Sequence, residues 1–152
     1  MKINGIIWLI SETRELANEF IINELKKQGI KELVPSHGNI LTNLYQNREM
    51  TMSEISKKIR KKCNTVTTLI NKLVILGYIQ KKTHSKDQRI TLISLTEKGK
   101  TFEKNFHVIS EKLINITYHN FKEQEKNDLM EKLLKIRSNF IAYKKNPACK
   151  NN

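Results

Sequence analysis

The chain has 152 residues, of which 38% are apolar and 28% are charged, which is enough for a compact domain with its own apolar core. No apolar run approaches the ~20 residues needed to cross a bilayer. The two cysteines, Cys63 and Cys149, are too few for a disulfide framework and lack zinc-ligand spacing. We therefore expect a cytoplasmic protein with no membrane partner, no metal and no cofactor.

Lys and Arg outnumber Asp and Glu by 28 to 15, which gives a net charge of +13. The excess is concentrated in residues 57–90, where ten Lys and Arg stand against one acid, Asp87, so this segment holds nine of the thirteen net charges. Such a block is typical of a surface that faces a polyanion. Lysine runs also occur on solvated surfaces, so the charge alone leaves both interpretations open.

Apolar residues at helical spacing predict a first helix over residues 5–28, which Gly29 ends. Pro35 suits the first turn of a second helix, because the missing N–H of proline costs nothing at that position. This second helix has one apolar face and is expected to end near Asn47.

Thr51 and Glu54 form a capping box, which predicts a short helix over residues 52–60. After a brief turn, a longer helix is expected to begin with Asn64 or a neighbour as its cap and to end at Gly77. An apolar stripe at helical spacing predicts the buried face of this helix: Val66, Leu69, Ile70, Leu73 and Leu76.

A β-hairpin is predicted next, with strands over 78–83 and 90–95 and a polar, charged tip between them. Thr96 is placed to cap a fifth helix, and a sixth helix is predicted over 122–144. A heptad-like apolar seam runs along the fifth helix: Phe102, Phe106, Ile109, Leu113 and Ile116. The predicted fold class is mainly α with a small β-hairpin wing.

A short capped helix, a turn, an amphipathic helix and a basic hairpin, in this order, indicate a winged helix-turn-helix that binds double-stranded DNA. An α-helix fits the major groove, where Asn and Thr side chains read the base edges. The polar face of the longer helix is the predicted reading surface: Asn64, Thr65, Thr67, Thr68, Asn71 and Lys72. Cations at its entrance are predicted to meet the phosphate backbone: Lys57, Arg60, Lys61 and Lys62. The hairpin tip supplies the predicted wing contacts: Lys86, Asp87 and Arg89.

Residues 64–80, which read NTVTTLINKLVILGYIQ, resemble the recognition helix and first wing strand of the MarR family of bacterial transcription regulators. Residues 86–89 (KDQR) and 95–99 (LTEKG) resemble the family's wing and the segment that follows it. The order of the helices also agrees, so the resemblance covers nearly the whole chain.

The resemblance implies that Lys86 enters the minor groove and that Asp87 and Arg89 shape the wing and meet the DNA backbone. This chain departs from the family pattern in having Lys86 and Gln88 where arginines are usual in the wing. Lysine lacks the planar fork of arginine, so a weaker minor-groove contact is expected. Thr68 also stands where an arginine is common, so the operator of a relative is not transferable.

The resemblance further implies a homodimer built from the first, fifth and sixth helices. Large apolar residues outside the winged unit need a partner surface or packing within the chain: Ile6, Ile7, Trp8, Ile10, Phe102, Phe106, Phe140 and Tyr143. The chain is thus predicted to be a single domain, 1–152, with a DNA-binding unit at 34–99 and a helical dimerisation region at 1–30 and 100–146. Two reading helices about one turn of DNA apart predict a pseudo-palindromic operator. The resemblance implies a sequence-specific transcription regulator on that operator; we expect a repressor, with an activator as the alternative.

Family members often release DNA when a small aromatic ligand binds between the dimerisation region and the winged unit. The resemblance therefore implies such an effector, with a constitutive DNA binder as the alternative. Four residues are candidates for its pocket, each with an ordinary structural alternative: Trp8, Arg14, His37 and Tyr45. Cys63 lies beside Lys61 and Lys62 near a helix N-terminus, and both features activate a thiol. A thiol-redox-responsive regulator is therefore an alternative, as is a small residue that merely fits the turn.

Enzymatic activity is not predicted, because the sequence has no phosphate-binding, nucleophile-elbow or zinc-protease motif. Another alternative is a winged module that binds protein or coats DNA without sequence preference. The Thr and Asn side chains of the reading surface favour sequence preference, because architectural proteins use Arg and apolar wedges instead.

Overall fold

The computed structural model describes residues 5–83, 87 and 89–145. The chain divides into two compact units, Met1–Leu113 and Ile114–Asn152. Among the described residues, no helix is both long enough and apolar enough to cross a membrane.

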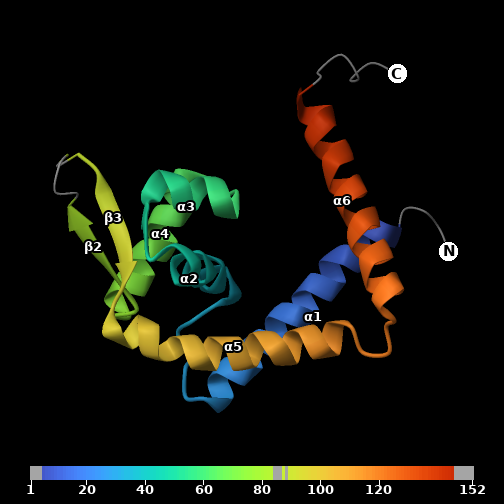
Figure 1. Ribbon diagram of the computed structural model, residues 1–152, viewed down its shortest axis with the longest axis horizontal. Coiled ribbons are helices and arrows are strands. Elements are labelled where there is room, and N and C mark those ends of the chain that lie inside the picture. The colour runs from blue at the N-terminus through green and yellow to red at the C-terminus, as the bar shows by residue number, and fades with distance from the viewer. Residues whose placement is uncertain (1–4, 84–86, 88, 146–152) are drawn as a thin grey trace. The chain divides into compact units, whose positions relative to one another are not determined.

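Six helices and three strands follow one another along the described residues (Figure 1): α1 (Gly5–Lys27), α2 (Pro35–Asn47), β1 (Glu49–Thr51), α3 (Met52–Ile59), α4 (Cys63–Ile75), β2 (Ile79–Thr83), β3 (Thr91–Leu95), α5 (Glu97–Thr117) and α6 (Glu123–Lys145). The first compact unit runs from α1 into α5, and the second holds the end of α5 with α6. The predicted DNA-binding unit at 34–99 thus belongs to a larger body that includes α1, and its boundaries stay a prediction.

The three strands form an antiparallel sheet in the order β1-β3-β2 (Figure 1). The predicted hairpin is present, and its strands begin at Ile79 and Thr91, one residue later than expected. The sequence does not predict β1, because three residues are too few to show an alternating pattern. β1 is held in place by its pairing with β3, in which Met50 lies opposite Ile93, a residue distant in the sequence. The predicted fold class, mainly α with a small β wing, is confirmed.

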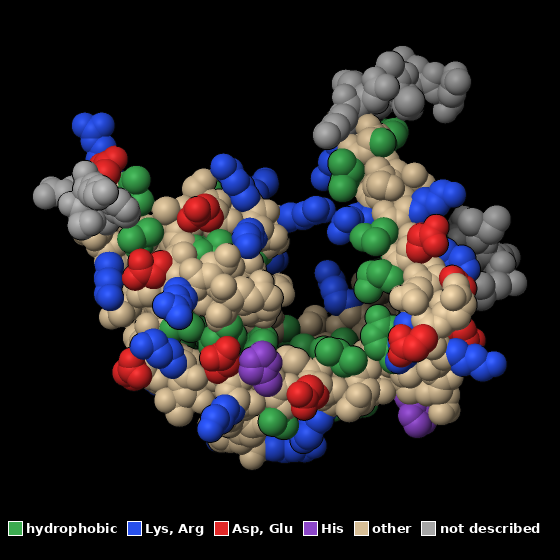
Figure 2. All heavy atoms as spheres, viewed as in Figure 1, with side chains coloured by type: hydrophobic (Ala, Val, Ile, Leu, Met, Phe, Trp, Pro, Cys, Tyr) green, Lys and Arg blue, Asp and Glu red, His purple; other side chains and the backbone are tan. Residues whose placement is uncertain are grey.

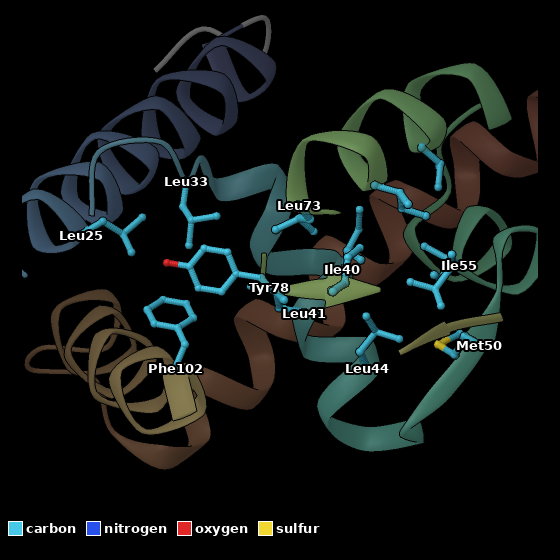
Figure 3. Packing of buried hydrophobic residues seen from close by; sticks show 14 of the residues in the cluster. Leu25, Leu33, Ile40, Leu41, Leu44, Met50, Ile55, Leu73, Tyr78 and Phe102 are labelled. Carbon is cyan, nitrogen blue, oxygen red and sulfur yellow. The ribbon is translucent and has the colours of Figure 1, made fainter. Parts of the chain in front are cut away.

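The helices α2, α3 and α4 and the sheet enclose one apolar core (Figure 3). Its fully buried side chains are Ile40, Leu41, Leu44, Ile55, Val66, Ile70, Leu73, Ile79 and Ile93. The predicted stripe of α4 supplies three of them, and Leu69 and Leu76 pack at the margin. Burial of each such side chain contributes about 1.5–3 kcal/mol, so the core, more than helix propensity, fixes where α4 lies.

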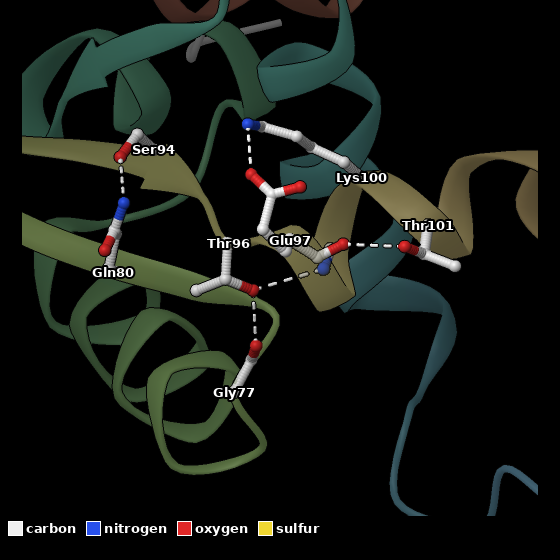
Figure 4. A network of polar contacts seen from close by, with 8 residues as sticks. Gly77, Gln80, Ser94, Thr96, Glu97, Lys100 and Thr101 are labelled. Carbon is white, nitrogen blue, oxygen red and sulfur yellow. Dashed lines mark hydrogen bonds and ion pairs between the residues drawn. The ribbon is translucent and has the colours of Figure 1, made fainter.

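Thr96 holds the junction between α4, the sheet and α5 (Figure 4). Its hydroxyl donates to the carbonyl of Gly77 at 2.5 Å and accepts from the N–H of Gly99 at 3.1 Å, which confirms its predicted capping position. A Cβ added at Gly99 would lie 2.1 Å from the carbonyl oxygen of Tyr78. Only glycine fits there, so α5 begins in direct contact with the backbone that leads into β2.

Two expectations about the helices are not met. α4 begins at Cys63 with Lys62 as its N-cap and has no side-chain cap bond, so Asn64 lies inside the first turn. The start of the predicted seam on α5 is not an unpartnered face, because Phe102 is buried and Phe106 packs against the same core. The rings of Tyr45 on α2 and Phe106 on α5 lie 5.4 Å apart, so these aromatic residues pack against each other within the first unit.

The second unit consists of the end of α5 and α6. The turn between them is held by the rings of Tyr118 and Phe121, 6.0 Å apart, and by Lys126, whose ammonium lies 5.6 Å from the ring centre of Tyr118. Residues 123–144 of α6 are all exposed or half-buried, and Figure 2 shows apolar side chains along this helix. The exposed large apolar side chains of α6 are Leu129, Met130, Leu133, Leu134, Phe140, Ile141 and Tyr143.

Candidate nucleic-acid interface

The start of α3 is fixed by the predicted capping box. The Thr51 hydroxyl accepts from the N–H of Glu54 at 3.2 Å, and the Glu54 carboxylate accepts from the N–H of Thr51 at 2.7 Å. These hydrogen bonds to Thr51 lower the pKa of Glu54, which keeps it ionised at the positive end of the helix dipole. The capping box is thereby confirmed, and it sets where the first helix of the helix-turn-helix begins.

The turn between α3 and α4 is closed by local hydrogen bonds. Arg60 ends α3 in the left-handed region, with φ at 53° and its N–H bonded to the carbonyl of Lys57. The Ser56 hydroxyl donates to the carbonyl of Lys61 at 2.7 Å, and the N–H of Lys61 donates to the carbonyl of Ser56 at 3.3 Å. The reversal brings α4 against α3 over the shared core.

α4 presents a polar face opposite its buried stripe. Five of the six predicted reading residues are exposed: Asn64, Thr65, Thr68, Asn71 and Lys72. Thr67 differs because it is half-buried. Its hydroxyl donates to the carbonyl of Cys63 at 2.9 Å, as that of Thr68 donates to the carbonyl of Asn64 at 3.1 Å. The Thr67 hydroxyl also lies 3.9 Å from the sulfur of Met52, so Thr67 braces α4 against α3.

A hydrogen bond joins the polar face of α4 to the wing. The ammonium of Lys81 on β2 donates to Oδ1 of Asn71 at 2.6 Å, and both side chains are exposed. Its charge assigns Lys81 to the basic segment of residues 57–90 but does not connect it with Asn71. Strand alternation is the signal that identifies it, because Lys81 shares a face of β2 with the buried Ile79.

The described part of the wing tip is shaped by Asp87. Its carboxylate accepts from the N–H of Arg89 at 2.9 Å, and its carbonyl accepts from the N–H of Ile90 at 3.0 Å. Asp side chains commonly form such turns with the backbone two residues on. Arg89 is exposed, whereas Lys86 and Gln88 lie outside the described residues. The DNA contacts of all the wing residues stay a prediction.

The cations at the entrance of α4 remain open to a polyanion. Lys57, Arg60 and Lys62 are exposed and Lys61 is half-buried. The ion pairs found among the described residues involve none of these four. Figure 2 shows Lys and Arg side chains projecting over this side of the molecule. Lys57 still feels the nearby charge of Glu54, but none of the four is held in an ion pair within the described residues, so their side chains are accessible to phosphates.

An apolar cavity of about 170 Å³ lies within the first unit, between α1, α2 and α5. The side chains lining it include Ile21, Leu25, Leu33, Phe106, Ile109 and Ser110. Of the four predicted pocket residues only His37 lines it, while Tyr45 borders a separate polar groove. Trp8 is 64% exposed and Arg14 is exposed, because both lie in the first half of α1 whereas the cavity forms at its second half.

His37 is a buried histidine that stays neutral. It is 3% exposed, and its Nδ1 accepts from the N–H of Val34 at 3.1 Å at the start of α2. Burial, and then the charge of Lys72, lower the pKa of His37 below its usual value. The imidazole is thus an acceptor at Nδ1 and carries its proton on Nε2.

Tyr45 and Cys63 lie apart from the apolar cavity, and each has a polar contact of its own. The Tyr45 hydroxyl donates to the carbonyl of Gly99 at 3.2 Å, and burial raises its pKa, so it links α2 to α5. Cys63 is the exposed first residue of α4, with its sulfur 3.6 Å from the hydroxyl of Ser56. The redox role predicted for Cys63 stays a prediction.

A capped helix, a tight turn, a helix with one buried and one polar face, and a small sheet with a basic hairpin together define a winged helix-turn-helix. A family model described as the MarR family matches residues 33–91. The HTH-type transcriptional regulator BilQ of Clostridium symbiosum is 31% identical over 129 residues, which cover 81% of this chain and 83% of the relative. The chain belongs to the MarR family of transcription regulators, as the sequence predicts.

Solved structures agree in fold. A MarR transcriptional regulator from Methanosarcina mazei superposes with a TM-score of 0.76 at 22% identity, over 91% of this chain and 98% of that one. A mutant MarR from E. coli, complexed with operator DNA, superposes with a TM-score of 0.76 at 18% identity, over 90% of this chain and 99% of that one. At these identities the likeness shows the winged-helix fold.

Proposed function

We propose that this chain is a homodimeric repressor that binds a pseudo-palindromic operator in double-stranded DNA through α4 and the wing. The observation that carries the proposal is the two-sided character of α4. Its stripe of Val66, Ile70 and Leu73 is fully buried, while Asn64 and Thr68 face outward as short polar groups able to reach base edges. The E. coli MarR with the same fold was solved on operator DNA, which supports this mode of binding.

The proposed DNA contacts are of two kinds. Asn64 lies in the first turn of α4, the part of a recognition helix that contacts base edges, and it carries a donor and an acceptor that match adenine. Lys57, Arg60 and Lys62 meet phosphates, which position the protein but carry no sequence information. From the wing, Arg89 is proposed to extend the backbone contacts and Lys86 to enter the minor groove.

A second copy of this chain is proposed to cover two apolar faces. On α1, Ile7 and Trp8 are 52% and 64% exposed, and on α6, Phe140 and Tyr143 are 58% and 50% exposed. Exposed apolar faces of this extent mark association surfaces in soluble proteins. Association would present two α4 helices to half-sites about 34 Å apart on the DNA.

A small aromatic effector is proposed to bind the cavity beside His37 and release the DNA. The cavity of about 170 Å³ is comparable to engineered apolar cavities of ~150 Å³ that hold benzene. The described lining residues include no Lys or Arg, and His37 and Ser110 are polar groups at the wall. These features favour an uncharged ring, such as a phenol, over an aromatic carboxylate, whose charge would be left unpaired.

The DNA-binding proposal is tested by selecting genomic DNA fragments with the purified protein at two salt concentrations around the physiological value. Recovery of one pseudo-palindrome at both concentrations is the expected result. Uniform recovery that falls steeply with salt would contradict it, because phosphate contacts alone give that behaviour. In that case a non-specific architectural or protein-binding role replaces the regulator.

The effector proposal is tested separately by thermal shift and DNA release with phenol and with benzoate. Phenol is expected to raise the melting temperature and weaken operator binding, and benzoate to do less. Ser110→Phe places a ring in the cavity and is expected to abolish both effects of phenol. Phenol effects that persist in this variant would place the ligand elsewhere.

A further inference from the structure

Asn71, two turns into α4, is held toward the wing by its side-chain oxygen. The Nζ of Lys81 donates to Oδ1 of Asn71 at 2.6 Å. A lysine ammonium offers donors and has no acceptor, so the amide atom that faces it must be the oxygen. The NH₂ group of Asn71 is therefore the end of the amide that remains for other partners.

This orientation changes which base Asn71 can read. Asparagine recognises adenine by accepting from N6 and donating to N7 at the same time. Lys81 occupies one of the two lone pairs of Oδ1 and places its positive charge beside that oxygen, so a further donor such as N6 of adenine is disfavoured there, whereas the NH₂ donors of Asn71 stay available. Guanine offers two acceptors, N7 and O6, on its major-groove edge, and its pattern is the one that matches a set of donors. Lys81 adds its remaining N–H groups beside the amide.

We propose that Asn71 and Lys81 form a donor-rich pair that reads a guanine in each half-site, with Lys81 as the residue that positions the amide. The inference rests on the proposed function, because it assumes that α4 enters the major groove. Asn64 is the contrasting case on the same polar face. Within the described part of the chain its side-chain amide has no hydrogen-bond partner, so it keeps the donor and acceptor that adenine requires.

Lys82 provides a matched control for Lys81. The two lysines are neighbours on β2, both are exposed, and each carries one positive charge. Strand alternation turns Lys82 to the opposite face of the sheet, where it borders a groove with Gln80 and Ser94. Removing either lysine lowers the net charge by one, but of the two only Lys81 donates to Asn71.

The test is selection from a randomised DNA pool at one salt concentration, with the wild-type chain, Asn71→Ala, Lys81→Met, Lys81→Arg and Lys82→Met. Asn71→Ala identifies the base position by making it degenerate. The wild type is expected to prefer guanine over adenine there by about tenfold or more. Lys81→Met is expected to shift the preference toward adenine, because the amide oxygen is freed. Lys81→Arg, which still donates, and Lys82→Met are expected to retain guanine.

Three results would overturn the inference: a wild-type position that already prefers adenine, no position affected by Asn71→Ala, or retention of guanine in Lys81→Met. Failure of the wild type to enrich any motif would instead overturn the proposed function, and the inference with it. All three positions are exposed, so the variants are expected to fold, and their melting curves provide the check.

Discussion

The winged core, which is formed by α2, α3, α4 and the sheet, buries its large apolar side chains, whereas α6 exposes them. Leu44 of α2 is 0% exposed and lies among buried neighbours (Figure 3), whereas Phe140 of α6 is 58% exposed. The first region completes its core with residues of its own chain. The second presents an apolar face that its own unit does not cover. The difference indicates that the stability of the fold resides in the first region, and the uncovered face of the second region is what supports the proposed association with a second copy.

The largest expected effect comes from truncating the winged core. Leu44→Ala is expected to lower the free energy of unfolding by about 3–4 kcal/mol, because it removes a fully buried side chain and leaves a cavity. Leu129→Ala on α6, where the side chain is 37% exposed, is the matched control. At protein concentrations low enough to keep the chain monomeric, this variant is expected to lower the free energy of unfolding by less than about 1 kcal/mol. Urea unfolding measures both. Equal losses would remove the contrast between the regions.

Gly99→Ala tests the contact that anchors α5 to the wing-bearing segment. Helix propensity favours alanine by about 1 kcal/mol, but the added Cβ would lie 2.1 Å from the carbonyl oxygen of Tyr78, and backbone atoms do not yield easily. The clash is expected to dominate and to lower the free energy of unfolding by roughly 2–3 kcal/mol. Gly5→Ala, which meets nothing within 4 Å, serves as the control. A stabilised Gly99→Ala variant would show that α5 is free to move away.

Phe140→Asp tests the association role of α6. A charge within the apolar face proposed to bind the second copy is expected to raise the dissociation constant roughly 30-fold or more. The monomer is expected to keep its fold, because Phe140 is exposed within the chain. Sedimentation velocity measures the mass and circular dichroism the fold. An unchanged mass in this variant would show that α6 is not part of the dimer surface.

A smaller effect is expected at the start of α3. Thr51→Ala removes the hydroxyl that accepts from the N–H of Glu54, and it is expected to lower the free energy of unfolding by about 1 kcal/mol. Thr51→Ser retains the oxygen and is expected to restore most of the loss. If alanine and serine behave alike, the cap does not contribute to stability.

The smallest effect is a pH dependence from His37. Because its pKa is lowered in the folded chain, the unfolded chain takes up a proton first as the pH falls below about 6.5, and stability falls from there. Glu24 and Glu54, whose pKa values are also lowered, lose their contribution only as the pH falls below about 4.5. Unfolding at pH 7.5 and 5.5 is therefore expected to show a larger stability loss in the wild type than in His37→Asn. The exposed His107→Asn is the control, and a loss of equal size in His37→Asn would rule out His37.

The sequence predicts the parts of this molecule that depend on local signals. The capping box at Thr51 and the stop at Gly77 follow from residue types at fixed spacing, and the stripe of α4 follows from helical periodicity. The polar face of α4 is recognisable from the same periodicity, because it lies opposite the stripe.

The remaining features depend on contacts between distant segments, which periodicity does not encode. β1 exists only through its pairing with β3, and the bond between Asn71 and Lys81 requires the hairpin to fold back on α4. Phe106 fits the spacing of a heptad seam but packs on α2 instead. The cavity beside His37 likewise forms from three helices, so its lining is only partly predictable from the sequence.

The central claim, that α4 reads sequence while nearby cations supply affinity, is tested most directly by comparing operator and scrambled duplexes at two salt concentrations. Asn64→Ala is expected to weaken binding to the operator alone, by about fivefold or more, and so to narrow the ratio between the two duplexes. Lys62→Ala is expected to weaken both equally and to reduce the salt slope by about 1. Equal losses on both duplexes for Asn64→Ala would contradict the claim.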